Sequence, residues 1–307
     1  MVGLVIKNTG SWYQVKTDRE VLIECKIKGN LRLNKIRSTN PIAVGDIVDF
    51  ELNSDGIGMI SAIHDRKNYI VRRSSNLSKQ SHILAANIDL VALIATVNYP
   101  ETSTVFIDRF LASAEAYRVS ACIIFNKTDL YNEQETRYLD ALEHLYSGLG
   151  YKVFRISAKK SVNLESLTGF FREKITLISG NSGVGKSTII NTIAPASMTK
   201  TAEISTYHNK GMHTTTFSEM FQLAEGGAVI DTPGIKGFGT VDMNKEEISH
   251  FFKEIFIKSG ECRFSDCTHV HEPGCAVLKA LEDKLISSSR YQSYISMLEE
   301  CEGGKYR

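Results

Sequence analysis

The sequence predicts an α/β protein of three parts: a small barrel of short strands, a central domain built on a parallel sheet, and a C-terminal helical module that holds a metal ion. Three observations support this. Short segments with alternating or β-branched apolar residues fill the first 66 positions. Strand-like and helix-like segments then alternate from residue 89 onward. Three cysteines and a histidine lie within one short stretch near the C-terminus.

The composition is that of an ordinary globular protein. Of the 307 residues, 42% are hydrophobic and 23% are charged, a balance typical of soluble domains. The formal net charge of +1 gives no global sign of a polyanionic partner. The sequence contains neither a secretory signal nor an apolar run of the ~20 residues that span a bilayer. We therefore expect a cytoplasmic protein with no membrane partner, and nothing in the sequence requires more than a monomer.

Residues 1–66 are expected to form an OB-type barrel that binds RNA. Strands are predicted at 12–17, 21–28, 46–53 and 58–64, with glycines between them. Several short strands in so few residues favour a small closed barrel. The segment 26–37 carries five basic residues and no acid. It either contacts RNA phosphates or is simply a solvated basic loop.

The central domain is expected at 88–240, after a polar, serine-rich linker at 67–87. Continuous apolar runs predict strands that are buried on both faces, and helical spacing between them predicts the covering helices. The strands are expected at 89–97, 121–125, 151–159 and 174–180, and the helices at 106–118, 134–150 and 163–173. This alternation predicts one parallel sheet.

The stretch after the strand at 174–180 matches a phosphate-binding loop, Gly-x-x-x-x-Gly-Lys-Ser, and a helical segment follows it. Glycines let the backbone N–H groups turn toward phosphates, Lys186 adds a charge, and Ser187 can ligate Mg²⁺. The residues expected to contact the nucleotide here are Gly180, Asn181, Ser182, Gly183, Val184, Gly185, Lys186, Ser187 and Thr188.

Two stretches upstream of this loop select guanine. The residues Asn126, Lys127, Thr128 and Asp129 follow a strand, and the Asp129 carboxylate can accept from both N1–H and the exocyclic amine of guanine. Asn126 is expected to brace neighbouring loops, and the stem of Lys127 to lie along the base. Ser157, Ala158 and Lys159 end the next strand, where the Ala158 N–H can reach guanine O6.

Downstream, the stretch 228–234 ends in Asp-Thr-Pro-Gly. Asp231 is expected on the Mg²⁺ side of the site, and the Gly234 N–H can reach a γ-phosphate. Three threonines at 214–216 lie between this motif and the phosphate loop. We favour Thr215 as the residue that joins Ser187 in holding Mg²⁺. An ordinary residue at a strand edge, with no role in metal binding, is an equally good interpretation of any one of these threonines.

These five motifs resemble those of switch GTPases in an unusual order. Such proteins usually begin with the phosphate loop, whereas here the guanine motifs come first. The order predicts a circularly permuted P-loop GTPase domain. A P-loop kinase or ATPase is the first alternative, but it has no need of Asp129. A non-catalytic RNA-binding protein that holds GTP only as a structural ligand is the second.

The cysteine cluster, Cys262-x4-Cys267-x-His269-x5-Cys275, offers three thiolates and one imidazole. This set suits a closed tetrahedral Zn²⁺ site of the structural kind, and His271 is a competing ligand. Helical patterns flank the cluster, so a helical zinc-binding domain is expected at 241–307. The other cysteines, Cys25, Cys122 and Cys301, lack partners at ligand spacing and are expected to be ordinary core or surface residues.

An N-terminal barrel, a permuted GTPase domain and a C-terminal module with three cysteines and a histidine together resemble the RsgA family, also called YjeQ or YloQ. The resemblance covers essentially the whole chain, and the motifs GNSGVGKS, HTTT and DTPG carry it. It implies a GTPase that acts late in 30S subunit assembly. GTP hydrolysis to GDP would be stimulated by the subunit, and the barrel and zinc module would contact 16S rRNA.

Two positions depart from related patterns. Met212 stands before the HTTT motif, where the family usually has a basic residue, so one phosphate or rRNA contact is in doubt. Ile235 follows DTPG, where switch GTPases often have a water-orienting glutamine, so slow intrinsic turnover is expected. Either His213 or a group brought by the ribosome must then orient the water, and a purely structural His213 is equally consistent. Lys186, Thr215 and His213 are the candidate catalytic residues.

Overall fold

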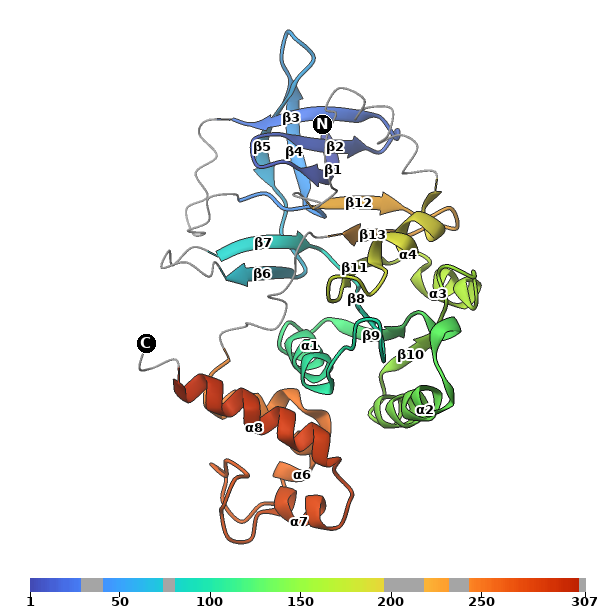
Figure 1. Ribbon diagram of the computed structural model, residues 1–307. Coiled ribbons are helices and arrows are strands. Elements are labelled where there is room, and N and C mark those ends of the chain that lie inside the picture. Colours follow the sequence, from blue (N-terminus) through green and yellow to red (C-terminus); the bar gives the residue numbers. More distant parts are fainter. Residues whose placement is uncertain (29–40, 74–80, 196–217, 232–242, 304–307) are drawn as a thin grey trace.

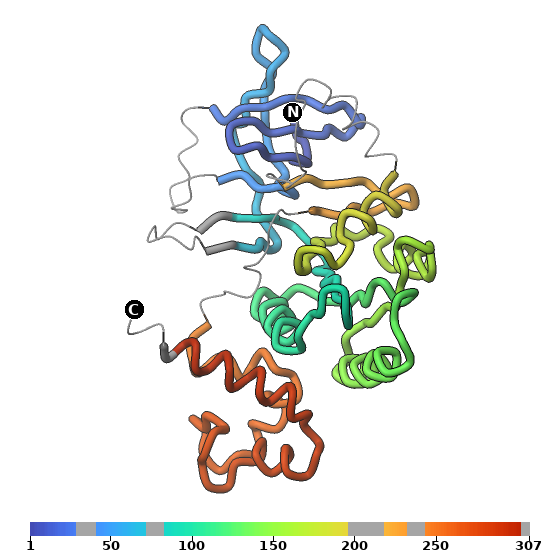
Figure 2. The backbone as a smooth tube through the Cα atoms, in the orientation of Figure 1, coloured from blue at the N-terminus to red at the C-terminus, as the bar shows by residue number. Residues whose placement is uncertain are grey.

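The computed structural model describes residues 1–28, 41–73, 81–195, 218–231 and 243–303. It has three parts: a strand barrel at one end, an α/β sheet in the middle and a helical module at the other end (Figure 1). The N-terminus lies in the barrel, and the last described residues lie in the helical module (Figure 2). This arrangement confirms the predicted order of the parts.

The barrel has five strands: β1 (Val2–Asn8), β2 (Tyr13–Thr17), β3 (Leu22–Ile27), β4 (Ile47–Leu52) and β5 (Gly58–Ile63). They are hydrogen-bonded in the order β1-β2-β3-β5-β4, and β4 pairs again with β1, which closes the barrel. Alternate residues point inward, as the two-residue period of a strand requires. The buried core contains Val5, Tyr13, Val15, Cys25, Ile42, Val48, Phe50 and Ile60. The OB-type barrel is thus confirmed, and β1 is a strand that the sequence patterns did not reveal.

β1 also joins the barrel to the central sheet. It pairs antiparallel with β12 (Glu219–Gln222), with Lys7 opposite Glu219. The Lys7 ammonium lies 3.1 Å from the Glu219 carboxylate. The pairing makes one continuous eleven-stranded sheet of barrel and α/β domain.

The segment expected as a linker at 67–87 is instead a hairpin of β6 (Tyr69–Arg73) and β7 (Ser81–Ala86). Ile70 and Ala85 are fully buried. Ala86 N–H donates to the carbonyl of Val44 at 2.9 Å, which fixes the hairpin against the segment before β4. The prediction was wrong because the apolar residues form two short runs, at 69–71 and 83–86, and the polar stretch between them concealed the two-stranded pattern.

The central sheet contains β8 (Leu90–Ala95), β9 (Ser120–Phe125), β10 (Lys152–Arg155), β11 (Ile175–Ser179), β12 and β13 (Ala228–Asp231). Their spatial order is β10-β9-β8-β11-β13-β12, and β12 alone runs antiparallel to its neighbour β13. The strands can be renumbered from β11, which precedes the phosphate loop, so that β11, β12 and β13 become strands 1 to 3 and β8, β9 and β10 become strands 4 to 6. Their spatial order from the β12 edge is then 2-3-1-4-5-6. A permuted chain therefore builds one unbroken sheet.

Helices cover both faces of this sheet. One core cluster packs α1 (Thr104–Ala116) and α2 (Glu133–Gly148) on one face. The other packs α3 (Leu164–Phe171) and α4 (Lys186–Ile193) on the opposite face. The strands between them are buried on both sides, which is why their sequences read as continuous apolar runs.

The C-terminal module consists of the 3₁₀ segment η2 (Lys245–Phe251) and the helices α6 (Lys253–Ser259), α7 (Ala276–Glu282) and α8 (Ser288–Gly303). Its core cluster includes Phe252, Ile255, Val277 and Tyr294, and Ala112 of α1 also belongs to this cluster. None of the helices in the described ranges is both long and apolar enough to cross a membrane.

A buried ion-pair network joins this module to the α/β domain. Arg290 of α8 is 1% exposed, and its guanidinium lies 2.9 Å from Asp108 of α1 and 2.6 Å from Glu254 of α6. Tyr146 and Ser293 donate hydroxyl hydrogen bonds to the same Asp108 carboxylate. Because the cation and the two carboxylates are paired and hydrogen-bonded, their burial is tolerated.

Candidate nucleotide site and metal centre

The phosphate loop leaves β11 in a conformation that requires glycine. Gly180 has φ +144°, and a Cβ there would lie 2.3 Å from the carbonyl oxygen of Ile94. Gly185 has φ +101°, and a Cβ there would lie 2.4 Å from the Asn126 side chain. These close approaches let the loop fold tightly and start α4 at Lys186. Ser187 and Thr188 are exposed in the first turn of that helix, where backbone N–H groups favour an anion.

Lys186 folds back over its own loop. Its ammonium donates to the carbonyls of Gly180 at 2.8 Å and Asn181 at 2.7 Å. Burial lowers the pKa of Lys186, and the carboxylate of Asp231 at the end of β13 acts against that shift. A half-buried ammonium held by carbonyl dipoles gains further stabilisation from a phosphate anion.

Asn126 joins three of the sequence motifs. Its amide nitrogen donates to the carbonyl of Val184 in the phosphate loop at 2.9 Å. Its amide oxygen accepts from the N–H of Ala158 at 3.1 Å. The residue is 2% exposed, so the amide orientation is fixed by these partners, as the sequence predicts for a brace.

The rest of the guanine motif lies around this brace. The Lys127 ammonium donates to the carbonyls of Gly183, at 2.7 Å, and Tyr99, so its stem crosses from the guanine motif to the phosphate loop. The Asp129 carboxylate accepts a hydrogen bond from the Ser157 hydroxyl. The Thr128 hydroxyl donates to the carbonyl of Ile156 at 3.0 Å. The motifs therefore meet at the carboxyl ends of β9, β10 and β11.

One feature of this site bears on the predicted contact with the base. The Ala158 N–H is used by Asn126, so a contact with guanine O6 requires that this donor be shared. Lys159 is exposed. The predicted residues Thr215, His213 and Gly234 lie outside the described residues, as do Met212 and Ile235.

Two tyrosines outside the sequence motifs complete the site. Tyr99 supplies the second carbonyl to Lys127. Tyr131 lies two residues after Asp129, and its hydroxyl donates to the carbonyl of Asn126 at 2.6 Å. No local pattern marks either residue, because each acts on a segment that only the folded sheet brings near. The proximity of Tyr131 to Asp129 in the sequence was the one available signal.

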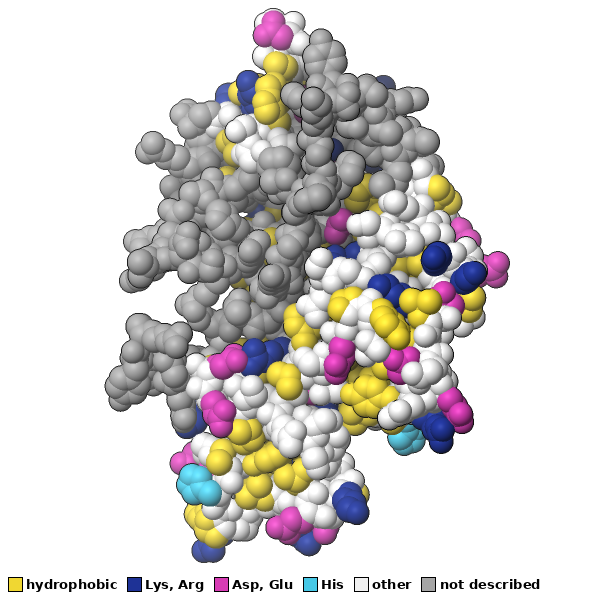
Figure 3. All heavy atoms as spheres, in the orientation of Figure 1, with side chains coloured by type: hydrophobic (Ala, Val, Ile, Leu, Met, Phe, Trp, Pro, Cys, Tyr) yellow, Lys and Arg dark blue, Asp and Glu magenta, His cyan; other side chains and the backbone are white. Residues whose placement is uncertain are grey.

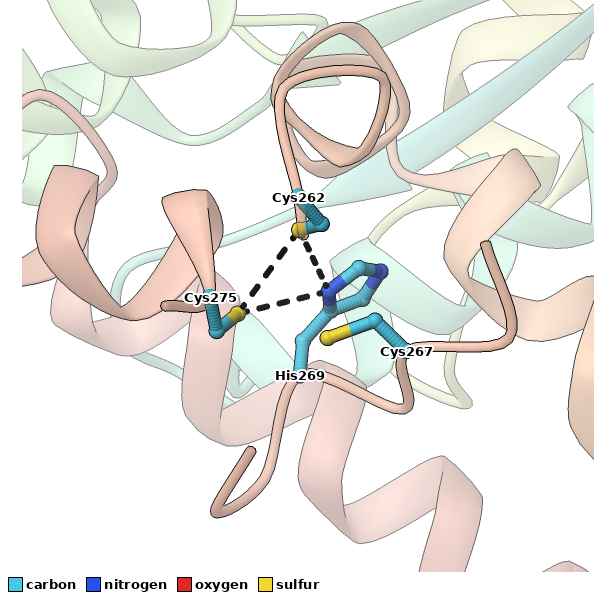
Figure 4. Close-up of side chains that lie close together, drawn as sticks. All are labelled: Cys262, Cys267, His269 and Cys275. Carbon is cyan, nitrogen blue, oxygen red and sulfur yellow. Dashed lines mark hydrogen bonds between the residues drawn. The ribbon is translucent and has the colours of Figure 1, made fainter. Parts of the chain in front are cut away.

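The cysteine cluster converges in the C-terminal module (Figure 4). The ligand atoms of Cys262, Cys267, His269 and Cys275 all lie within 4.8 Å of one another. The Nδ1 atom of His269 is 3.6 Å from the Cys262 sulfur and 3.5 Å from the Cys275 sulfur. These two sulfurs are 3.9 Å apart. The four predicted ligands thus form one site that could hold a metal ion.

Glu272 organises the loop that carries these ligands. Its carboxylate accepts from the N–H groups of Thr268 at 2.7 Å, Val270 at 3.0 Å and His271 at 3.2 Å. The hydroxyl of Tyr291 donates to the carbonyl of His269 at 2.8 Å. His269 is nearly fully buried, and burial lowers its pKa. The neutral imidazole that results is the form that binds a metal.

The remaining histidine and cysteines lie outside this centre. His271 is exposed and is not among the converging ligands, which decides the choice between the two histidines in favour of His269. Cys25 and Cys122 are buried in the barrel and sheet cores, and Cys301 is half-buried in the module. All three are therefore ordinary core or boundary residues, as expected.

The sheet order, the phosphate loop and the guanine motifs joined by Asn126 define a circularly permuted P-loop GTPase with an N-terminal barrel and a C-terminal metal-binding module. Two family models match the chain: the RsgA GTPase model over residues 63–241 and the RsgA N-terminal domain model over residues 2–60. The chain belongs to the RsgA GTPase family.

Similar proteins agree over the whole length. A protein of Bacteroides thetaiotaomicron named small ribosomal subunit biogenesis GTPase RsgA 2 is 66% identical, with 100% of this chain and 99% of that protein covered. A relative from Phocaeicola vulgatus is 65% identical over the same shares. The crystal structure of YjeQ from Thermotoga maritima has a TM-score of 0.78 at 36% identity, and covers 98% of both chains. That of YloQ, described as a circularly permuted GTPase, has a TM-score of 0.75 at 29% identity, covering 100% of this chain and 96% of the other.

Proposed function

We propose that this protein is a GTP-hydrolysing switch that acts late in maturation of the small ribosomal subunit, and that the subunit stimulates its turnover. The names of its close relatives, small ribosomal subunit biogenesis GTPases, support the assignment to this process. The observation that carries the nucleotide assignment is the position of Asn126, which hydrogen-bonds to the phosphate loop and to the second guanine motif at once.

In this proposal the guanine base is selected by Asp129, whose carboxylate matches two adjacent donors of guanine. The second carboxylate oxygen is available for this pairing while the first accepts from Ser157. The γ- and β-phosphates lie on the N–H groups of residues 180–188, and the ammonium of Lys186 leaves its loop carbonyls to reach them. Mg²⁺, held by Ser187 and Thr215 on the Asp231 side, would supply positive charge between the two phosphates.

Hydrolysis then proceeds by in-line attack. The oxygen of water bonds to the γ-phosphorus, the bond to the β–γ bridging oxygen breaks, and the water proton leaves with the phosphate product. The protein contributes positioning and electrostatic stabilisation rather than a covalent intermediate. The water is oriented by His213 or by a group that the subunit brings.

The metal of the C-terminal module is proposed to be one structural Zn²⁺. In a tetrahedral site, Zn–S bonds of about 2.3 Å place two sulfurs roughly 3.8 Å apart, and a Zn–N bond of about 2.0 Å places nitrogen roughly 3.5 Å from sulfur. The distances of 3.9 Å, 3.6 Å and 3.5 Å among Cys262, Cys275 and His269 suit these values. Four protein ligands leave no open position for a substrate, so the role is structural.

Contacts to 16S rRNA are proposed for the barrel and the zinc module. On the barrel, the Lys26 ammonium lies 4.0 Å from the centre of the Trp12 ring. On the module, the guanidinium of Arg263 lies 5.4 Å from the ring of Phe264. Cationic groups beside aromatic rings suit both phosphates and unstacked bases.

The module also exposes large apolar side chains. Figure 3 shows hydrophobic atoms gathered on the surface of the C-terminal module. Among the described residues of this module, the exposed large hydrophobic ones are Phe256, Ile257, Phe264, Val270 and Leu285. Exposed apolar side chains that gather on one small module are typical of a partner-binding surface, which supports a macromolecular partner at the module.

Phosphate release from GTP and from ATP, with and without purified 30S subunits, tests the proposal. Turnover of GTP, but not of ATP, should rise when 30S subunits are added. Asp129→Asn should raise the KM for GTP roughly 10- to 100-fold, and Lys186→Ala should lower turnover by about 10²- to 10³-fold. Asp140→Asn, which removes an exposed carboxylate paired with Arg155, should behave as wild type.

The other outcomes point to the alternatives. Equal turnover of ATP would indicate a P-loop ATPase. GTP binding without turnover, even with 30S subunits, would indicate a protein that uses GTP as a structural ligand. GTP turnover that ignores 30S subunits would keep the guanine site and remove the subunit as activator.

A further inference from the structure

The hydroxyl of Tyr131 connects two main-chain groups beside the nucleotide site. It donates to the carbonyl of Asn126 at 2.6 Å and accepts from the N–H of Val97 at 2.9 Å. Asn126 and Val97 are 2% and 8% exposed, so both main-chain groups need a partner inside the protein. One phenol therefore links the end of β8 to the first residue of the guanine motif.

The carbonyl that Tyr131 holds belongs to the peptide that precedes Lys127. Lys127 adopts φ +64° and ψ +30°, the left-handed region that residues with a side chain seldom occupy. Such a conformation persists only where surrounding contacts fix it. In this conformation the Lys127 side chain reaches the carbonyls of Gly183 and Tyr99.

The N–H group that donates to the Tyr131 hydroxyl is that of Val97, in the loop over residues 97–100. The same loop also contacts Lys127. Within this loop, the Asn98 amide donates to the Glu135 carboxylate of α2 at 2.7 Å. Tyr99 has φ +63°, and its carbonyl receives the Lys127 ammonium. The loop, the guanine motif and the phosphate loop are thus tied together, with Tyr131 at the junction.

We propose that Tyr131 is a positioning residue of the nucleotide site: its hydroxyl holds the peptide between Asn126 and Lys127, together with the 97–100 loop, in the arrangement that guanine and phosphate binding need. It acts through Asn126 and Lys127 and does not touch the nucleotide. This inference rests on the proposed guanine-nucleotide site. Burial raises the pKa of Tyr131 to about 12, so the hydroxyl keeps its proton and remains a donor at neutral pH.

The test compares GDP and GTP binding by the full-length wild type, Tyr131→Phe and a matched control, Tyr151→Phe. The Tyr151 hydroxyl donates to Glu115 at 3.1 Å. Tyr151 precedes β10, at the opposite end of that strand from the guanine motifs. Loss of the Tyr131 hydroxyl should weaken GDP and GTP equally, by about tenfold, through faster dissociation. The KM for GTP should rise by a similar factor, with a smaller change in kcat. Tyr151→Phe should lower the melting temperature without changing either affinity.

A second variant, Asn98→Ala, releases the same loop from α2 and keeps the test open if Tyr131→Phe does not fold. It should weaken GDP by about threefold, because the pair with Glu135 is partly exposed. GDP affinity equal to that of wild type in the folded Tyr131→Phe protein, or in Asn98→Ala where only that variant folds, overturns the inference. Absence of GDP binding by the wild type would instead refute the proposed function.

Discussion

The nucleotide site and the cysteine cluster are built in opposite ways. The nucleotide site gathers segments that are distant in sequence. Asn126 lies 32 residues from Ala158 and 58 residues from Val184, and its side-chain amide hydrogen-bonds to a main-chain group of each. The cysteine cluster draws all four ligands from the short range between Cys262 and Cys275, and these meet through side-chain atoms.

The difference determines where each site gets its stability. The nucleotide site rests on a sheet whose two faces are packed by separate core clusters, so its loops are shaped before any ligand binds. The cysteine cluster sits in a small helical module with one core cluster, and small domains of this kind depend on a metal. Loss of the bound metal and loss of the bound nucleotide should therefore have very different consequences for stability.

The largest effect is expected from replacement of a residue that coordinates the metal. Cys267→Ser should abolish metal binding and unfold the C-terminal module, since structural Zn²⁺ contributes about 10–16 kcal/mol in zinc-finger peptides. GDP binding should persist, because the nucleotide motifs lie on the central sheet. Bound zinc per chain, limited proteolysis of the module and GDP affinity, measured on one preparation, check this.

Cys301→Ser is the matched control for that variant. Cys301 is half-buried in the same module and is not one of the converging ligands. It should keep its zinc and its protease resistance. A Cys267→Ser protein whose module stays resistant to protease would contradict the view that the ion, rather than the small core, holds this region together.

The same contrast explains what could be predicted from the sequence. The cysteine spacing indicated the metal centre because all its geometry is local. The phosphate loop and the guanine motifs were visible because each is a short strand-to-loop pattern, and the apolar runs at 89–97 and 174–180 predicted β8 and β11. The motif order alone indicated the permutation that the sheet order bears out.

What the sequence did not reveal depends on long-range pairing. β1 and β12 meet each other across the two domains, and neither carries a strong period of its own. The hairpin of β6 and β7 was mistaken for a linker because a polar stretch separates its two short apolar runs. The roles of Tyr131 and Arg290 were not foreseen, since Arg290 meets Asp108 at a separation of 182 residues.

A second, intermediate effect is expected where the two regions join. Arg290→Met leaves the buried carboxylates of Asp108 and Glu254 without their cation, and breaking a buried pair in this way costs about 3–5 kcal/mol. The module should melt at a lower temperature and separate from the α/β domain. Thermal unfolding followed by circular dichroism, together with GDP affinity, measures both consequences.

Arg109→Met provides the control for this joint. Arg109 is also on α1 and reaches α8 through Ser296 and Glu300, but the Glu300 side chain is exposed, so about 0–1 kcal/mol is expected. Equal destabilisation by the two variants would show that burial of the Arg290 pair is unimportant. Loss of GDP binding by Arg290→Met would show that the two regions are not independent.

The smallest effect is expected from Glu272→Gln, because Glu272 does for the metal loop what Asn126 does for the nucleotide motifs. Burial acts to raise the pKa of Glu272, but hydrogen bonds from Thr268 and the His271 N–H outweigh it and lower that pKa. A carboxylate with a lowered pKa stabilises the fold above its unfolded value of about 4.3 and loses this contribution as the pH falls through its folded value.

The variant should therefore be less stable than wild type by about 1–3 kcal/mol, by a constant amount from about pH 6 to pH 8 and by less in acid. Chemical unfolding of zinc-loaded wild type and variant at matched pH measures the difference. Glu261→Gln, which removes an exposed carboxylate paired with Lys258, should change stability by less than about 0.5 kcal/mol at every pH. A Glu272→Gln protein as stable as the Glu261→Gln control would mean that the metal alone shapes the loop. The cluster would then lack the polar brace on which the nucleotide site depends.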